Sequence, residues 1–430
     1  MPETRESVPA RHIAAVVIGN ALEFYDFLTY AFFAVYIGRV FFPSNDPSAS
    51  LLASLAAFGS GFVMRPIGAL VIGKMGDRLG RKPAMILSFW LMGVAIAGLA
   101  LTPSRAAIGV AAPVLAVFFR MLQGFALGGE VGPTTAFLLE VAPPGRRGFY
   151  TAFQFWTQDL SVLISGLVGF GLANTLTEQQ LQDFGWRIAF LAGALIVPFG
   201  LAMRRRLPET LPAPDAGKRD PIRLRPYLPV AVIGLLLLAS STIGAYVLDY
   251  MTTYAIATLH MPSNAAFAAT VVVGLCGVLL DLVSGALSDR FGRKRTMLVP
   301  CVLLLLSMLP AFYAISHYQT TAVLLGATAV LSSLLSLSAV PMIVWITESL
   351  PAAIRSGSVA LIYAVSISIF GGTTQYAITL LIKATGNPVA PAWYWTAALL
   401  IGIAAMCATR ESAPRRTAKF TEWKDGDLVR

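Results

Sequence analysis

The chain has few charged residues for its length. Only 13% of its 430 residues are Asp, Glu, Lys or Arg, whereas 56% are hydrophobic, and soluble domains average about 25% charged residues. This shortage excludes soluble enzymes, nucleic-acid-binding proteins and disordered chains. The apolar residues form long continuous runs instead of alternating with polar ones, which excludes an outer-membrane barrel. The composition therefore predicts an all-α membrane protein.

Cysteine and histidine are also scarce, with three residues of each type. Cys276, Cys301 and Cys407 lie in apolar runs without a CxxC pair or a histidine at ligand spacing, so we expect small, buried apolar side chains there. The HExxH and GxSxG motifs of hydrolytic enzymes are absent as well. We expect no metal site, no cofactor and no enzymatic activity.

Charged or Pro/Gly-rich breaks divide the apolar runs into twelve candidate membrane spans. Each run is long enough, or nearly so, for the roughly 20 apolar residues that a spanning helix needs. The predicted spans are 12–37, 50–72, 83–102, 107–139, 149–173, 186–203, 227–250, 264–287, 296–316, 320–347, 357–382 and 391–409.

A polar segment rich in Pro, Arg and Asp separates the first six spans from the last six. We therefore expect an N-terminal six-helix bundle (1–203), a cytoplasmic linker (204–226), a C-terminal six-helix bundle (227–409) and a cytoplasmic tail (410–430).

The basic residues predict the orientation. Of the 32 Lys and Arg residues, 26 fall in the two tails and in the loops that follow even-numbered spans, and basic loops favour the cytoplasmic side. Only Arg39, Arg105, Arg187 and Lys383 fall on the other side. We expect a multi-pass protein of the plasma (cell inner) membrane with both termini in the cytoplasm. The net charge of +10 then faces anionic lipid and not nucleic acid.

Two motifs occur once in each half of the chain. The pattern G-x-x-x-D-R-x-G-R-K begins at Gly73 and again at Gly285, 212 residues later. The pattern E-x-x-P-x-x-x-R begins at Glu140 and again at Glu348, 208 residues later. Internal duplication of six spans is typical of transporters. It predicts two pseudo-symmetric bundles around a central cavity.

The repeated motifs place charged residues in short loops at the predicted cytoplasmic end. Asp77 lies where it can cap a helix or pair with Arg81. We expect further pairs of Glu140 with Arg147 and of Glu348 with Arg355, which hold this end closed and break when it opens. A role in topology and lipid binding alone is the alternative. The candidate gating residues are Asp77, Arg78, Arg81, Asp289, Arg290, Arg293, Glu140, Arg147, Glu348 and Arg355.

Both G-x-x-x-D-R-x-G-R-K loops resemble the signature loops of the major facilitator superfamily, and the resemblance covers essentially the whole chain. Residues 19–27 (GNALEFYDF), 64–69 (MRPIGA), 120–130 (RMLQGFALGGE) and 185–190 (GWRIAF) more narrowly resemble the metabolite:proton symporter family. Within that family, residues 144–151 (PGRRGFYT) and 369–372 (IFGG) are most similar to citrate–proton symporters. The resemblance implies the twelve-helix fold of the superfamily and proton-coupled uptake.

Several ionisable residues lie inside the predicted spans. A charge in hydrocarbon costs several kcal/mol unless it is paired or faces water, so each of these residues is a functional candidate. They are Glu23, Asp26, Arg65, Arg120, Glu130, Asp159, Asp249 and Asp281.

Asp26 and Arg120 are the candidate proton-coupling pair. Asp26 lies about 21 Å into the first span, and Arg120 should reach a compatible depth in the fourth. An Asp beside Arg stays ionised, and it takes a proton when substrate or closure removes that Arg. The superfamily resemblance implies the same roles, because proton-coupled sugar porters use a first-helix Asp with a fourth-helix Arg. A static ion pair is the alternative; Glu23, one turn away, could relay the proton.

Arg120 is also the predicted sensor of an anionic substrate. Arg65 is expected to be structural, Glu130 is either structural or functional, and Asp249 is expected to face water near an outer end. The candidate substrate-binding residues are Arg120, Gln154, Gln158, Asp159, Tyr250 and Tyr363, with Tyr246, Trp345 and Gln375 as further neutral candidates.

The sequence thus predicts a proton-coupled symporter that imports a small organic acid, citrate or a related tricarboxylate, by rocking about the linker. Its expected partners are the substrate, the co-transported proton and the lipid bilayer; we expect a monomer. The six embedded acids outnumber the two arginines, so a symporter of a zwitterionic osmolyte (betaine or proline type) or a cation-efflux antiporter is the alternative. An ion channel would instead require a continuous pore.

Overall fold

The computed structural model of the chain describes residues 21, 24, 25, 27–79, 81–128, 131–205 and 225–413. Throughout these ranges the regular structure is helical and contains no strand, which confirms the all-α prediction. The first half comprises α2 (Ala34–Phe41), α3 (Pro47–Leu79), α4 (Arg81–Leu101), α5 (Arg105–Ile108), α6 (Ala111–Leu127), α7 (Val131–Val141), α8 (Arg147–Thr175), α9 (Glu178–Gln180) and α10 (Trp186–Arg205).

The second half is built in the same way, from long helices joined by short turns. It comprises α11 (Leu228–Asp249), α12 (Met251–Ala257), α13 (Ser263–Phe291), α14 (Arg293–Tyr318), α15 (Thr321–Glu348), α16 (Ala352–Ser366), α17 (Gly372–Thr385) and α18 (Ala390–Ala408). A π-helical turn, Ile367–Gly371, joins α16 to α17. The predicted span 357–382 therefore runs continuously through a π-turn.

Within the described residues, 8 helices are long and apolar enough to cross a membrane, and Ile86–Leu101 and Ala111–Leu127 are shorter apolar helices. Large apolar side chains cover the outer faces of the helices, including Leu195 of α10, Leu306 and Trp393, which are 79%, 68% and 65% exposed. Such a surface is unstable in water and matches the hydrocarbon of a bilayer. The protein is a multi-pass membrane protein.

The span predicted for 107–139 is covered by α6 and α7, and residues 129 and 130 between these helices lie outside the described part of the chain. Two details differ from the prediction. The first span is interrupted at Phe33, where one turn residue separates helical residues 27–32 from α2. Of the three free cysteines only Cys301 is buried, because the side chains of the other two reach the outer surface wholly or in part.

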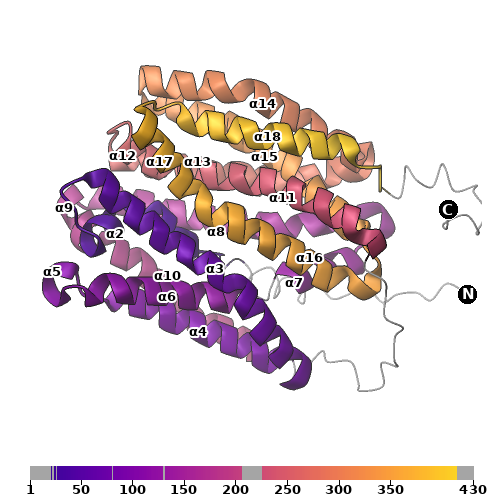
Figure 1. Cartoon of the computed structure of the whole chain (residues 1–430), viewed down its shortest axis with the longest axis horizontal. Helices are drawn as coiled ribbons and strands as arrows, with labels where there is room; N and C mark the ends of the chain where they lie inside the picture. The colour runs from indigo at the N-terminus through magenta and orange to yellow at the C-terminus, as the bar shows by residue number, and fades with distance from the viewer. Residues whose placement is uncertain are drawn as a thin grey trace, which may run out of the picture.

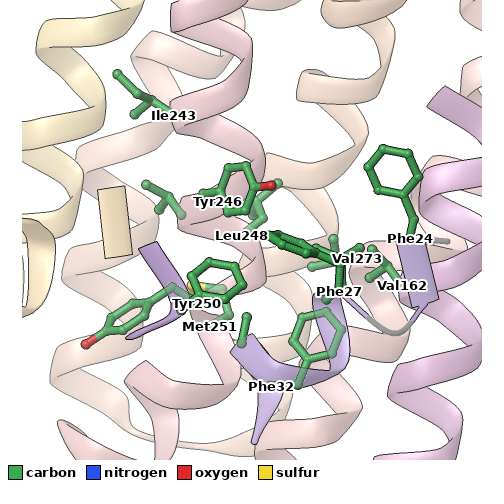
Figure 2. Packing of buried hydrophobic residues seen from close by; sticks show 14 of the residues in the cluster. Phe24, Phe27, Phe32, Val162, Ile243, Tyr246, Leu248, Tyr250, Met251 and Val273 are labelled. Atoms are coloured by element: carbon green, nitrogen blue, oxygen red, sulfur yellow. The ribbon is translucent and has the colours of Figure 1, made fainter. Parts of the chain in front are cut away.

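The two halves of the sequence lie side by side (Figure 1). Helices α3, α4 and α6 form one side of the molecule, α14, α15 and α18 form the other, and α8 and α13 lie between them. One continuous set of buried apolar residues joins the halves; it includes Phe27 and Val162 from the first half and Tyr246 and Val273 from the second (Figure 2).

Glycines allow the closest helix contacts in this interior. A Cβ added to Gly124 of α6 would meet the backbone of Gly61 in α3, and one added to Gly285 of α13 would meet the backbone of Gly148 in α8. Only a residue without a side chain fits between backbones this close. Sequence-distant helices can therefore approach each other along their full length.

Gly124→Ala is expected to destabilise the protein by about 1–3 kcal/mol, because the new methyl group would collide with the α3 backbone. The thermal unfolding midpoint of detergent-solubilised protein measures this change. Gly171→Ala is the matched control: it also lies in a long helix, but an added Cβ has open space there, so better helix propensity should leave stability equal or higher. Equal unfolding midpoints for the two variants would contradict the packing argument.

Candidate functional site: a cavity between the two halves

A central cavity lies between the two halves of the chain. Its volume is about 90 Å³. The first half contributes the helical residues Phe24 and Leu28 and part of α8. The second half contributes α11, α13, α15 and α16.

Three aspartates, one from each of three helices, line this cavity. They are Asp159 of α8, Asp249 of α11 and Asp281 of α13. Asp249 and Asp281 are 6% and 1% exposed, so the expectation that Asp249 faces open water is wrong: it ends α11 inside the protein. No Lys or Arg lies among the lining residues that the structure describes.

The predicted substrate residues divide into two groups. Gln158, Asp159 and Tyr363 line the cavity, as does Tyr246. Gln154 and Tyr250 do not: Gln154 accepts a hydrogen bond from Thr135 at 3.5 Å, and the Tyr250 hydroxyl accepts one from Thr379 at 2.7 Å.

The two further neutral candidates also lie outside the lining. Trp345 donates to the carbonyl of Arg410 at 2.8 Å, and Gln375 donates to the carbonyl of Tyr246 at 3.4 Å. The sequence analysis missed the lining hydroxyl groups, Ser241, Thr242, Ser332 and Ser336, because serine and threonine are common in apolar helices and carry no distinguishing pattern.

Two buried arginines lie together within the first half. The guanidinium carbons of Arg65 and Arg120 are each 4.3 Å from the centroid of the Phe27 ring. Arg65 also lies 4.6 Å from the Phe62 ring, and Arg120 lies 4.5 Å from the Tyr30 ring. Aromatic faces stabilise a cation without hydrogen-bonding it, so this arrangement leaves the N–H groups available.

Most of these N–H groups have no acceptor among the described residues. Arg120 donates to Gln123 at 2.6 Å and to the carbonyl of Phe27 at 3.5 Å. The Nε and Nη2 atoms of both Arg65 and Arg120, and Nε2 of Gln123, are buried without a hydrogen-bond partner in the described part of the chain. Buried donors of this kind require an acceptor, and an anion would provide one.

The predicted proton carriers Glu23 and Asp26 lie outside the described residues, and so does Glu130. The Asp26–Arg120 pair therefore remains a prediction. Arg65, which the sequence analysis assigned a structural role, lies in the same aromatic cluster as Arg120.

A buried ion network closes one end of the second half. Arg293, fully buried at the start of α14, contacts Asp289 at 2.8 Å and Glu348 at 3.0 Å. Asp289 also accepts hydrogen bonds from the backbone N–H groups of Gly148 and Phe149 at 2.9 and 3.0 Å. A carboxylate at the N-terminus of α8 is favourable because the helix dipole is positive there. Asp289 therefore joins the second half to the first.

The Glu-Arg pairing differs from the expected one. Glu140 pairs with Arg355 at 3.1 Å, and Glu348 pairs with Arg293, so the predicted Glu140–Arg147 and Glu348–Arg355 partners are wrong. The reason is that the two halves meet at this end, which brings α7 of one half against α16 of the other. Arg290 is exposed and lies 5.3 Å from the Phe291 ring. The side chains of Asp77, Arg78 and Arg81 lie outside the described part.

The halves also touch at the opposite end. Lys383, at the end of α17, contacts Asp46 at 2.6 Å, and this hydrogen bond lowers the pKa of the exposed Asp46 carboxyl. Tyr36 of α2 and Ser263 of α13 are joined by a hydrogen bond of 2.6 Å. Both ends of the cavity are thus bridged by polar contacts between the halves.

A helical membrane fold with a polar cavity enclosed between two halves defines a class of solute transporters. Residues 16–373 match the family model of the Major Facilitator Superfamily. The chain belongs to this superfamily.

Known relatives cover almost the whole chain. The chain is 34% identical to a citrate-proton symporter of Klebsiella pneumoniae, over 92% of this chain and 90% of that protein. It is 33% identical to the alpha-ketoglutarate permease of Escherichia coli (strain K12), over 90% and 91%. It is 28% identical to the proline/betaine transporter of the same strain, over 94% and 84%.

A solved structure agrees with the fold. The proton:xylose symporter XylE, bound to 6-bromo-6-deoxy-D-glucose, superposes with a TM-score of 0.76 at 18% identity, covering 94% of this chain and 96% of that one. At this identity the likeness shows the fold alone.

Arg293→Met is expected to destabilise the protein by about 3–5 kcal/mol, because Asp289 and Glu348 would stay buried without their cation. Arg293→Lys should lose less stability than Arg293→Met, because lysine keeps the positive charge although it lacks the forked geometry of the guanidinium group. Arg295→Met, an exposed arginine in the same helical turn, is the control and should change stability little. Thermal unfolding measures all three; equal stability of Arg293→Met and Arg295→Met would contradict the buried network.

Proposed function

We propose that this protein is a proton-coupled symporter that imports a small organic acid, with citrate or a related tricarboxylate as the leading substrate. The observation that carries the proposal is the pair of buried arginines, Arg65 and Arg120, whose N–H groups lack acceptors among the described residues. The chemistry of relatives named as citrate-proton symporter and alpha-ketoglutarate permease supports it.

A carboxylate satisfies this site better than a neutral solute. Arginine presents a planar fork of donors that matches a carboxylate, and a charge-assisted hydrogen bond is roughly twice as strong as a neutral one. Arg120 would bind the anion, with Gln158 and Tyr363 contacting the rest of the substrate in the cavity. Asp26 and Glu23 would carry the coupling proton.

One observation favours a second candidate, a symporter of a zwitterionic osmolyte. Asp159, Asp249 and Asp281 line the cavity, and three carboxylates would repel a citrate trianion but attract a quaternary or protonated amine. The relative named as a proline/betaine transporter is consistent with such a substrate. A cation-efflux antiporter would use the same acidic wall.

Transport would proceed by alternating access of two six-helix bundles, residues 1–203 and 227–409, rocking about the linker 204–226. Glu140–Arg355 and Asp289 with the start of α8 would close the cytoplasmic end. Asp46–Lys383 would close the opposite end. The excess of basic residues in the tails and even-numbered loops supports cytoplasmic termini, including the tail 410–430, and an inner-membrane location.

Proteoliposomes with an imposed pH gradient should accumulate labelled citrate, and a protonophore should abolish this accumulation. Arg120→Gln should reduce citrate uptake by more than about tenfold, because losing one partner of a buried charged contact costs about 2–5 kcal/mol. Arg120→Lys keeps the positive charge and should reduce uptake less. Arg105→Gln, an exposed arginine far from the cavity residues in sequence, should transport normally. Gradient-driven betaine uptake without citrate uptake would overturn the first candidate in favour of the second.

Asp26→Asn should retain exchange of labelled for unlabelled citrate but lose gradient-driven accumulation, because an amide cannot bind and release the coupling proton. Exchange and accumulation are measured in the same vesicles, so a general loss of folded protein would lower both. Unchanged accumulation would remove Asp26 from the coupling mechanism.

A further inference from the structure

Two of the cavity carboxyl groups face each other across the boundary between the halves. Asp159 belongs to α8 of the first half and Asp281 to α13 of the second. The Asp159 carboxyl packs against Gly277, one helical turn before Asp281, where no side chain would fit. Because Gly277 and Asp281 are one turn apart on α13 and both aspartates line the same cavity, the two carboxyl groups lie close together.

A hydrogen bond between two carboxyl groups requires a proton. Ionised carboxylates are acceptors only, so one member of the pair must be protonated to donate, and two carboxylates held together in a dry site repel each other. Asp281 is 1% exposed, it lines the cavity, and its Oδ2 atom has no hydrogen-bond partner among the described residues. A buried acceptor without a donor is the second sign that the site binds a proton.

Among the described residues that line the cavity, no Lys or Arg could replace this proton. The titratable groups around the pair are Asp249 and Tyr246 of α11, Cys276 of α13 and Tyr363 of α16. Helix α15 contributes the hydroxyl groups of Ser332 and Ser336. No group of three or more His, Cys, Asp or Glu side chains could hold a metal ion within the described ranges.

The pair lies within an extensive contact between the two halves. Gly274 of α13 packs against Leu163 of α8, and the Trp156 indole of α8 donates to the carbonyl of Val278 in α13 at 3.0 Å. Asp159 lies about 18 Å from the first residue of α8, and Asp281 about 15 Å from the last residue of α13, so both are near mid-membrane. Any rocking of one half against the other changes the distance between these two carboxyl groups.

We propose that Asp159 and Asp281 share one proton across the boundary between the halves, and that this proton couples pH to the closing of α8 against α13. When the proton is bound, the hydrogen bond holds the helices together. When it leaves to the aqueous side, two carboxylates remain, and their repulsion separates the helices. This inference rests on the proposed symport and adds a proton site that is distinct from Asp26.

Infrared spectroscopy of the protein in lipid nanodiscs tests the site without any substrate. The C=O stretching band of one protonated carboxyl group should be present at neutral pH in the parent protein and lost in Asp159→Asn and in Asp281→Asn. In either variant the new amide donates to the remaining carboxylate, which then needs no proton. Asn has nearly the same shape as Asp, so both variants are expected to fold, and the same loss of the band is expected in each.

Two further variants control this measurement. Asp46→Asn removes an exposed carboxylate that Lys383 keeps ionised, so it should leave the protonated-carboxyl band unchanged. Asp249→Asn removes the third cavity acid without touching the pair, so the band of the pair should persist. A band that survives in both pair variants would overturn the proposal; if it disappears in Asp249→Asn alone, the proton resides on Asp249 and the shared site is wrong.

Transport measures the coupling role, with labelled citrate as the probe. Asp281→Asn should retain exchange of labelled for unlabelled citrate. Its ratio of internal to external citrate should fall about tenfold below that of the parent protein for each pH unit of imposed gradient, because one coupled proton contributes a factor of ten per pH unit. Full accumulation would overturn the coupling role. If the parent protein does not transport citrate, the proposed substrate fails while the infrared result still decides whether the proton site exists.

Discussion

An unpaired charge is costly in the interior of a membrane protein, and among the described residues two arginines and three cavity acids lie in different regions of this interior. Arg65 and Arg120 lie among aromatic rings in the first half, and the cavity acids lie on α8, α11 and α13. Tyr246, which packs against Phe62 at 5.4 Å between ring centroids, also lines the cavity. Among the described residues these arginines form no ion pair with the three cavity acids, so both groups remain candidates for binding substrate.

The sequence predicted the helical architecture well because apolar length and glycine position are local properties. The apolar runs located α13, α14 and α15 to within a few residues, and the repeated loop placed Asp289 and Arg293 one turn apart, where they pair at 2.8 Å. The interruption of the first span at Phe33 was not predicted, because one turn residue inside an apolar run does not change the hydropathy pattern.

The partners of Glu140 and the burial of Asp249 depend on contacts between helices distant in sequence, so the sequence alone could not predict them. Glu140 and Arg147 are seven residues apart in the sequence and were expected to pair, whereas the second half places Arg355 within 3.1 Å of Glu140. Asp249 lies near the end of an apolar run, and sequence position alone cannot tell an outer surface from a cavity wall. Hydropathy locates a residue along the membrane normal, whereas function depends on which way the residue faces.

The second copy of the repeated loop, with Asp289 and Arg293, joins the two halves through charges that would remain neutralised if the halves parted. Asp289 binds the N-terminus of α8, which belongs to the other half, and Arg293, which belongs to its own. Separation would remove only the backbone donors, and the buried Arg293–Glu348 contact would persist. The exposed Glu140–Arg355 pair contributes little, about 0–1 kcal/mol. In the proposed rocking movement, this end would therefore open without leaving a buried charge unpaired, which would cost several kcal/mol.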